Sequence, residues 1–268
     1  MEKNFVLITG ATGGLGNAFC NQFASLGYNL FLTATKTERL LKLKEDLLKK
    51  FNTIQIEIFA CDLSNLTNIS KLTDYILSNN INISFFVSNA GFITEGSIEN
   101  CPIDTMQKCI DVNCKGSLQL IKTIVDNKQY AQKLNIICIA SLAGNYPMPY
   151  MAIYSSTKAF LKNFMLAMRH EYKGKNVNIL VVEPGAIATS KEMKEAIKAQ
   201  GLKGKLSSVS PEKIAKISYK KSCKNKARYI PGFFNKLTLW SSNLLPTQLK
   251  IKVISKMWKK SQNKRGII

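Results

Sequence analysis

The chain has 268 residues, of which 46% are hydrophobic and 21% are charged, so it is long and apolar enough to bury one sizeable core. Its seven cysteines are odd in number, spread out and free of CxxC pairs, and it has one histidine, which argues against a disulfide framework or a metal site and favours reduced thiols in the cytoplasm. The net charge of +21 is uneven, because residues 1–212 hold 23 Lys/Arg and all 17 acids whereas residues 213–268 hold 15 Lys/Arg and no acid.

Short apolar runs alternate with helical patterns along most of the chain. The first run is too short for a signal peptide, and no stretch approaches the 18 apolar residues of a membrane span. Runs rich in branched and aromatic residues predict strands at 5–9, 30–34, 54–60, 83–89, 134–141 and 177–183. Helical periodicity predicts helices near 14–26, 37–51, 66–79, 103–127, 152–173 and 191–200. This alternation predicts an α/β fold with a doubly wound parallel sheet, helices on both faces and ligands at the carboxyl ends of the strands.

A glycine-rich turn, TGATGGLG at 9–16, joins the first predicted strand to the first predicted helix. Glycines let the backbone turn tightly and approach a pyrophosphate, which then lies on the amides at the positive end of a helix. The spacing of Gly10, Gly14 and Gly16 differs from G-x-G-x-x-G, and no GK[ST] follows. The turn therefore predicts a nucleotide site of another family.

The end of the second predicted strand, FLTATKTER, bears on the choice of cofactor. NAD enzymes usually place an acid there to bind the ribose 2′-hydroxyl. This chain has Ala34 and Thr35 instead, followed by Lys36 and Arg39, and cations favour the 2′-phosphate of NADP. The pattern predicts NADP rather than NAD.

A tyrosine and a lysine stand four positions apart in YSSTK, at Tyr154 and Lys158, and Ser141 ends an apolar run thirteen residues earlier. On a helix the phenol and the ammonium share one face. An ammonium at roughly 4–5 Å, with an effective dielectric of about 20, favours the phenolate by about 3–4 kcal/mol. The lysine is therefore expected to lower the pKa of the phenol and make it an acid/base catalyst.

Several motifs together resemble the short-chain dehydrogenase/reductase family over roughly residues 4–231. They are TGATGGLG, CDLS at 61–64, NAG at 89–91, Asn113, Ser141, YSSTK and PGAIAT at 184–189, in the family's order and spacing. The resemblance implies a Rossmann-type fold and hydride transfer between a nicotinamide and a carbonyl or alcohol carbon. The family's usual arginine is absent at Thr35.

The resemblance also implies roles for four catalytic residues. Ser141 would donate a hydrogen bond to the reacting oxygen and Tyr154 would deliver the proton. Lys158 would lower the pKa of Tyr154 and bind the nicotinamide ribose, and Asn113 would hold a water that relays protons from Lys158. A surface amide that caps a helix is the alternative for Asn113.

The residues expected at the cofactor surround its pyrophosphate, adenine and nicotinamide. Asp62 would accept a hydrogen bond from the adenine amine, although it could instead cap the next helix. Asn89 is expected to brace the central strands. The full cofactor set is Gly10, Thr12, Gly13, Gly14, Leu15, Gly16, Thr35, Lys36, Arg39, Asp62, Leu63, Asn89, Ala90, Gly91, Tyr154, Lys158, Pro184, Gly185, Ile187 and Thr189.

The substrate is expected to be apolar or medium-sized, because apolar and aromatic residues follow Ser141. Residues 190–210 are long and polar and are expected to form a mobile flap. The expected substrate contacts are Ser141, Ala143, Tyr146, Met148 and Tyr154, with Gly144, Pro147, Tyr150 and Phe92 as further walls.

The tail, 232–268, is expected to be a basic helical extension of a catalytic domain formed by 1–231. Leu249, Val253, Ile254, Met257 and Trp258 form an apolar stripe bordered by lysines, typical of an in-plane membrane anchor. The alternative is that the stripe packs on the substrate lobe or on a second subunit. No nucleic-acid motif accompanies the charge, so a nucleic-acid partner is not expected.

Two functions remain open at this point. One is an NADP(H)-dependent oxidoreductase, active as a homodimer or tetramer, cytoplasmic and with possible peripheral membrane contact through the tail. The other is a regulatory or interaction protein that keeps the nucleotide fold without turnover. Ser141, Tyr154, Lys158 and Asn113 favour the enzyme.

Overall fold

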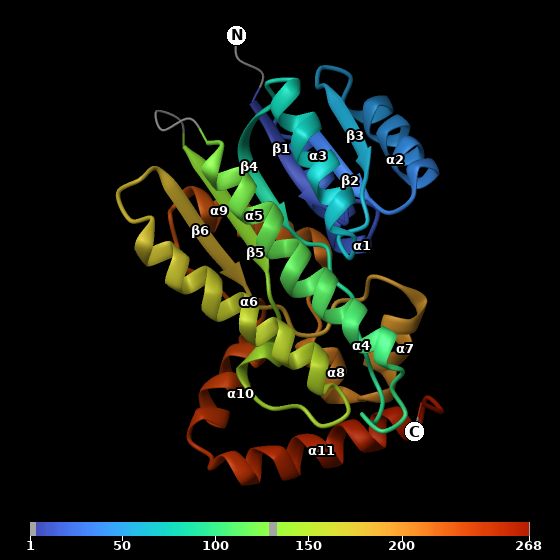
Figure 1. Cartoon of the computed structure of the whole chain (residues 1–268). Coiled ribbons are helices and arrows are strands. Elements are labelled where there is room, and N and C mark those ends of the chain that lie inside the picture. The colour runs from blue at the N-terminus through green and yellow to red at the C-terminus, as the bar shows by residue number, and fades with distance from the viewer. Residues whose placement is uncertain (1–3, 129–132, 268) are drawn as a thin grey trace.

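The computed structural model describes residues 4–128 and 133–267, and a parallel sheet of seven strands forms the centre of this part of the chain (Figure 1). The strand order is β3-β2-β1-β4-β5-β6-β7. The strands are β1 (Asn4–Thr9), β2 (Asn29–Ala34), β3 (Ile56–Ala60), β4 (Asn82–Ser88), β5 (Leu134–Ile139), β6 (Val177–Val182) and β7 (Arg228–Tyr229). All six strands predicted from the sequence are present.

Helices cover both faces of the sheet, which confirms the doubly wound α/β fold (Figure 1). Side chains alternate along each strand, so Val6 and Ile8 of β1 pack with the first layer whereas Phe5 and Leu7 pack with the second. The first layer contains α1 (Gly14–Ala24), α2 (Thr37–Lys50) and α9 (Pro211–Cys223). The second contains α3 (Leu66–Ser78), α5 (Ser117–Asp126) and α6 (Ala152–Glu171).

The strand order reverses between β1 and β4. The chain runs outward from β1 to β3, then crosses back to place β4 on the other side of β1. Connections on opposite faces diverge at such a point and leave a crevice beyond the carboxyl ends of the two strands. The fold therefore places the ends of β1 and β4, at Thr9 and Ser88, beside the ligand crevice.

The predicted helix 103–127 is three segments: α4 (Ile103–Ile110), a π-helical turn η1 (Asp111–Gly116) and α5. The turn lies against the loop after β3, where a side chain at Gly116 would bring its Cβ within 2.1 Å of the Leu63 carbonyl oxygen. Ser117 donates a hydrogen bond of 3.2 Å to the Val112 carbonyl, five residues earlier. Such π turns occur often at functional sites, and this one contains Asn113.

Two short helices, α7 (Lys191–Ala199) and α8 (Leu202–Ser207), occupy residues 190–210, the region expected to be a polar flap. A further short helix, η2 (Leu142–Asn145), follows β5. Ser190 caps α7 by accepting a hydrogen bond from the Met193 amide, and Ser210 caps α9, whose first residue is Pro211. Helix α9 was not among the predicted helices.

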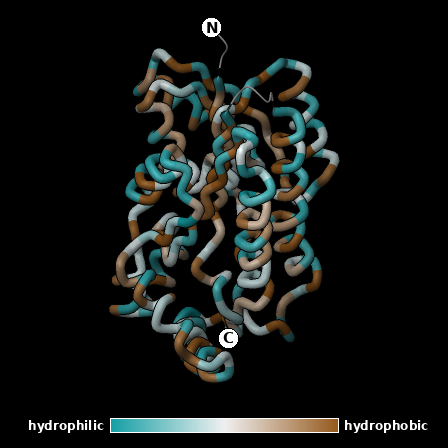
Figure 2. The backbone as a smooth tube through the Cα atoms, turned by 90° about the vertical axis from the view of Figure 1, so that its left-hand side faces the viewer, coloured by the Kyte–Doolittle hydropathy of each residue, from teal (hydrophilic) through white to brown (hydrophobic). Residues whose placement is uncertain are grey.

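The tail is helical as predicted and folds as two helices, α10 (Phe233–Asn243) and α11 (Thr247–Asn263), joined at Pro246. They lie at the end of the molecule opposite the N-terminus in both views (Figures 1 and 2). No helix of the described residues is long and apolar enough to cross a membrane. The domain boundary at residue 231 stays a prediction.

Candidate active site

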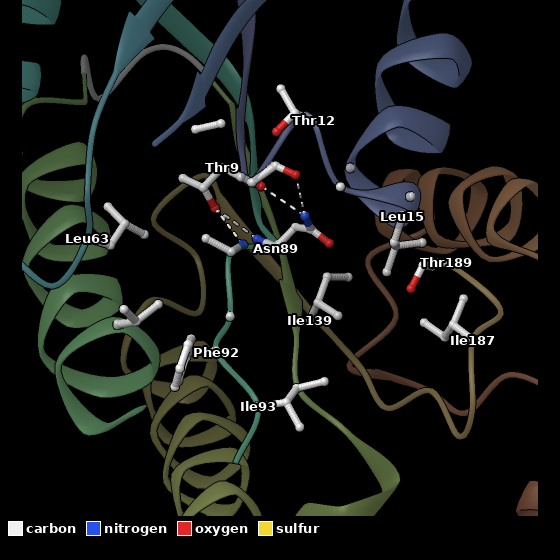
Figure 3. A pocket seen from close by; sticks show the side chains of 18 of the residues that line it. Thr9, Thr12, Leu15, Leu63, Asn89, Phe92, Ile93, Ile139, Ile187 and Thr189 are labelled. Carbon is white, nitrogen blue, oxygen red and sulfur yellow. Dashed lines mark hydrogen bonds between the residues drawn. The ribbon is translucent and has the colours of Figure 1, made fainter. Parts of the chain in front are cut away.

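The ends of β1 and β4 are tied together by one threonine and one asparagine (Figure 3). The Thr9 hydroxyl accepts hydrogen bonds from the amides of Asn89 and Ala90, each at 3.0 Å. The Asn89 side-chain amide donates to the carbonyls of Thr9 at 2.9 Å and Gly10 at 3.2 Å. These hydrogen bonds fix the spacing between the carboxyl ends of β1 and β4.

The glycine turn between β1 and α1 is built on backbone that larger residues cannot adopt. Gly10 has a φ of +63°, in the left-handed region. A Cβ at Gly16 would lie 2.2 Å from the Gly10 carbonyl oxygen. The turn therefore leads directly into α1, whose first amides face the crevice.

A cavity of about 540 Å³ occupies this crevice. Every residue predicted to bind the cofactor lines it, except Lys36 and Arg39. Leu15, Ile187 and Thr189 lie on one side of it, and Leu63 and Phe92 on the other (Figure 3). Other lining residues were not predicted to bind the cofactor, namely Thr9, Thr33, Ala34, Cys61, Phe92, Ile93, Lys108, Val112, Ile139, Ala140, Ser141 and Met193, although Ser141 was predicted to be catalytic.

Lys36 and Arg39 lie just outside the cavity. Thr35 lines it, and the exposed Lys36 follows at the N-cap of α2, with the exposed Arg39 in the first turn of that helix. Neither cation has an ion pair among the described residues. Both long side chains are thus available at the rim.

Asp62 does not cap the following helix, so that alternative is wrong. One of its carboxylate oxygens accepts hydrogen bonds from the Ser64 amide at 2.9 Å and the Ser64 hydroxyl at 2.8 Å. Asn65 caps α3 instead, by accepting from the Asn68 amide. The second Asp62 oxygen has no hydrogen bond within the described residues, and the residue lines the cavity.

Tyr154 and Lys158 share one face of α6, and Ser141 stands opposite them at the end of β5. Lys158 is only 3% exposed, and its ammonium donates a 2.9 Å hydrogen bond to the Ile139 carbonyl. The ammonium lies 5.9 Å from the centre of the Tyr154 ring. The structure therefore brings the three residues together at the inner end of the cavity.

Burial shifts the pKa values of this pair in the opposite direction from the one expected from charge. It raises the pKa of Tyr154 to about 12, although a hydrogen bond with Ser141 opposes the shift. It also lowers the pKa of Lys158. The lysine contacts a carbonyl rather than the phenol, so desolvation outweighs its attraction for a phenolate. The predicted lowering of the tyrosine pKa is therefore wrong for these residues alone.

Asn113 is fully buried, which rules out a surface amide that caps a helix. Its side-chain oxygen accepts from the Phe92 amide at 2.8 Å. Its amide donates to the Phe92 carbonyl at 2.9 Å and the Thr157 hydroxyl at 3.0 Å. Both amide protons are thus used within the protein. Asn113 ties the segment after β4 to α6, and the relay water stays a prediction.

An ion pair between the buried Glu183 and the exposed Arg228 fixes the segment that carries Ser141. Glu183 accepts two hydrogen bonds from Arg228, at 2.7 and 2.9 Å, and one from the Asn145 side chain at 2.9 Å. Lys162 of α6 donates to the carbonyl of Gly144 and the side chain of Asn145. These contacts join η2 to both β7 and α6.

A second cavity, of about 380 Å³, extends from Ser141 and Tyr154 toward the tail. All the predicted substrate residues line it: Ser141, Ala143, Tyr146, Met148 and Tyr154. The further walls Gly144, Pro147, Tyr150 and Phe92 do not. A Cβ at Gly144 would lie 2.7 Å from the Lys158 backbone, so this glycine serves close packing on α6.

The tail supplies lining residues of this cavity that were not predicted from the sequence. Ile254 and Trp258 of α11 pack against the buried cluster of Ala143, Met148 and Met151, against which Tyr146 and Tyr154 also pack. Further lining residues come from α7 and α10, including Met193, Ile197, Phe234 and Thr238. The apolar stripe of α11 was the available signal, and its alternative placement on the substrate lobe holds for Ile254 and Trp258.

Within the described residues, no group of three or more His, Cys, Asp or Glu side chains is placed to hold an ion. The single histidine, His170, is exposed at the end of α6.

Comparisons with known proteins agree with this geometry. A model of the short chain dehydrogenase family matches residues 4–200. A very-long-chain 3-oxoacyl-CoA reductase of Ajellomyces capsulatus is 27% identical over 193 residues, which cover 70% of this chain and 56% of the relative. An NADP-dependent 3-hydroxy acid dehydrogenase of Escherichia coli O157:H7 is 29% identical over 183 residues, which cover 68% of this chain and 72% of the relative.

Solved structures share the fold. An L-sorbose reductase of Gluconobacter frateurii in complex with NADPH superposes with a TM-score of 0.75 at 22% identity, covering 87% of this chain and 97% of that one. The chain spans little more than half of the length of some curated relatives that it matches, such as the fungal reductase.

Proposed function

Because this chain belongs to the short-chain dehydrogenase family and is an oxidoreductase, we propose that it interconverts a carbonyl group and an alcohol with NADP(H). The observation that carries the proposal is the position of Ser141, Tyr154 and Lys158. They lie where a cavity at the switch point of the sheet meets an apolar second cavity. A hydride donor in the first cavity and a carbonyl in the second would meet at these three residues.

The first cavity suits a dinucleotide. Gly10, Gly14 and Gly16 place no side chains at their positions in the turn, and a Cβ at Gly14 would lie 2.7 Å from the Thr189 side chain, so a pyrophosphate can approach the amides there. Lys36 and Arg39 are placed to meet a 2′-phosphate at the rim. The E. coli relative carries NADP dependence in its name, which supports the same choice.

The chain's own residues account for the polar steps. When bound, the nicotinamide supplies the hydride that adds to the carbonyl carbon. The carbonyl electron pair moves onto oxygen, where Ser141 donates a hydrogen bond and Tyr154 transfers its phenolic proton to form the alcohol. Lys158 stabilises the phenolate that remains, and the reverse reaction returns the proton to Tyr154. Asn113 keeps Phe92 and α6 in place beside the reacting groups.

The second cavity suits an apolar or medium-sized carbonyl compound. Met148, Met151 and Ala196 are buried in its wall, and Tyr146, Ile254 and Trp258 add apolar surface. The fungal relative is named for a long-chain 3-oxoacyl substrate, a carbonyl compound with an apolar chain. A small-molecule ketone of this type is the proposed substrate class.

Four further proposals concern the whole protein. The enzyme works as a homodimer or tetramer, is located in the cytoplasm, and makes peripheral membrane contact through the tail. Residues 1–231 form the catalytic domain and 232–268 the extension. The exposed apolar residues on α4 and α6 support the dimer, and the basic tail supports the membrane contact.

The test compares Tyr154→Phe with Tyr172→Phe, which makes the same change at the other end of α6. NADPH oxidation is followed by absorbance with a panel of aldehydes and ketones, and NADPH affinity by fluorescence. Tyr154→Phe should lose turnover by at least about 100-fold while NADPH affinity stays within a few fold. Tyr172→Phe should match the wild type. Wild-type turnover in Tyr154→Phe would exclude the catalytic assignment.

A further inference from the structure

The substrate cavity has a buried end and an open end. At Tyr154 its wall is formed by Ala143, Met148 and Met151, each less than 10% exposed. At the other end its wall is formed by Leu245, Val253 and Met257, which are 40–46% exposed. The cavity therefore reaches the surface between α10 and α11.

The helices that frame this opening expose an unusual number of large apolar side chains. Phe233, Leu237, Trp240 and Leu244 recur on one face of α10, and three of them are 64–81% exposed. Leu249, Val253 and Met257 recur on one face of α11. We call these seven residues the portal face. Exposed apolar residues grouped on neighbouring helices mark an interaction surface.

The surroundings of the portal face are positively charged. Helix α11 carries the exposed Lys252, Lys256 and Lys260, with Lys250 lining the cavity and Lys236 on α10. No acidic residue occurs after Glu212. The expected occupant is therefore both apolar and anionic.

A bilayer with anionic headgroups meets both requirements. Lysines beside such a surface contribute about 1 kcal/mol each, while apolar side chains enter the boundary between headgroups and acyl chains. An exposed tryptophan such as Trp240 is well suited to that boundary. A second copy of this chain fits less well, since a two-fold contact would set the lysines of one tail against those of the other.

We infer that α10 and α11 rest on an anionic bilayer surface and that an apolar substrate passes from the bilayer directly into the cavity. The opening between Leu245, Val253 and Met257 is the entrance. The apolar path then continues past Ile254 and Trp258 to Tyr154. The contact with the bilayer is inferred from the exposed apolar and basic residues of the tail alone, whereas the passage of a substrate rests on the proposed function.

The binding arm uses the full-length protein and two matched triple variants. Leu237→Ser/Leu244→Ser/Leu249→Ser removes apolar area from the portal face, where these leucines are 45–69% exposed. Leu26→Ser/Leu41→Ser/Leu66→Ser makes the same change on α2, α3 and the loop after α1, where they are 45–47% exposed. Thermal melting verifies that both variants fold.

Each protein is sedimented with phosphatidylcholine vesicles and with vesicles that also contain phosphatidylglycerol. The wild type should bind the anionic vesicles, less at high salt, and the portal variant should bind at least about tenfold more weakly. The control variant should bind like the wild type. Equal binding to both vesicle types, or full binding by the portal variant, would overturn the inference. So would a portal variant that loses only self-association by light scattering, because the occupant would then be a second copy.

The passage arm compares a long-chain ketone carried in the anionic vesicles with a small water-soluble ketone. The portal variant should lose turnover of the vesicle-borne ketone by at least about tenfold and retain turnover of the soluble one. Equal retention of both activities would overturn direct passage. Wild-type protein without activity on either ketone would contradict the proposed function, while the sedimentation result would still decide the bilayer contact.

Discussion

Lys158 is buried and Tyr154 on the same helix face is partly buried, and the loss of water around each group favours its neutral form. For Tyr154 the folded pKa is raised to about 12, above its ordinary value of 10, so ionisation favours the unfolded chain between these pH values. For Lys158 the folded pKa is lowered, so its charge opposes folding at neutral pH and this cost falls as the pH rises through that pKa. Tyr154 and Lys158 therefore add no stability of their own at neutral pH through their ionisation.

Titration of the protein without cofactor tests whether burial affects the pKa of Tyr154 more than the charge of Lys158 does. The ultraviolet absorbance of tyrosinate is followed in wild type, Tyr154→Phe and the control Tyr172→Phe. Up to pH ~10 the wild type and Tyr154→Phe should show the same tyrosinate absorbance, because the phenol of Tyr154 stays protonated. The opposite result would be an absorbance of about one tyrosinate that appears in the wild type between pH 6 and 9 and is lost in Tyr154→Phe. It would show that the charge of Lys158 affects the pKa of Tyr154 more than burial does.

Cofactor preference should depend on one residue at the rim of the first cavity. Lys36 is exposed beside Thr35. In Lys36→Glu the new carboxylate would repel the 2′-phosphate of NADPH and could accept a hydrogen bond from the 2′-hydroxyl of NADH. The ratio of kcat/KM for NADPH to that for NADH should fall at least about tenfold. Lys42→Glu makes the same charge change further along α2 and should leave the ratio alone. Equal use of both cofactors by the wild type would contradict the proposed NADP preference.

At the scale of elements, the sequence could predict what depends on local pattern. Six strands and six helical regions follow from the periodicity of apolar residues, and the turn after β1 follows from its closely spaced glycines. The π turn at Asp111–Gly116 could not be predicted, because it depends on the close approach of Gly116 to Leu63, far away in sequence. The stripe on α11 was visible, but the pattern does not say what Ile254 and Trp258 pack against.

The end of α11 is fastened to the catalytic part by polar contacts. Arg265 donates a 2.7 Å hydrogen bond to Glu95, whose carboxylate lines the substrate cavity, and both side chains are only 16% exposed. The Gln262 amide donates to the Tyr150 carbonyl at 3.2 Å. These two contacts hold the helix across the cavity near its last turn.

Arg265→Met should therefore loosen the tail, because it leaves the mostly buried Glu95 without its partner. The free energy of unfolding should fall by about 1–3 kcal/mol in urea titration, and limited proteolysis should cut within 232–268 more quickly. Lys264→Met, one residue earlier and exposed, serves as the control and should change neither measurement. Stability and cleavage like the wild type in Arg265→Met would mean that packing of Ile254 and Trp258 alone holds α11.

At the scale of the whole molecule, two of the surfaces that expose apolar side chains differ in charge. The portal face lies in a segment with cations only. The second surface lies on α4, α5 and α6 and exposes Ile103, Ile110, Leu118 and Phe160. Its charges are mixed, as the ion pairs Lys115–Asp111 and Lys122–Asp126 show. A two-fold axis can pair a mixed surface with its own copy without net repulsion, so the second surface suits a dimer contact.

We expect a homodimer or tetramer built on this second surface. Met165 and Met168 of α6 are used in the core, but Phe160 stays exposed and stacks on Phe164 at 5.9 Å, which leaves an apolar ridge for a second subunit. Phe160→Glu should shift the protein toward monomer in light scattering at micromolar concentration, because a charge would be buried at the centre of the contact. The portal variant should keep the wild-type mass, since its leucines lie on α10 and α11. A wild type that is monomeric under these conditions would refute the assembly, and dissociation of the portal variant alone would transfer the contact to the tail.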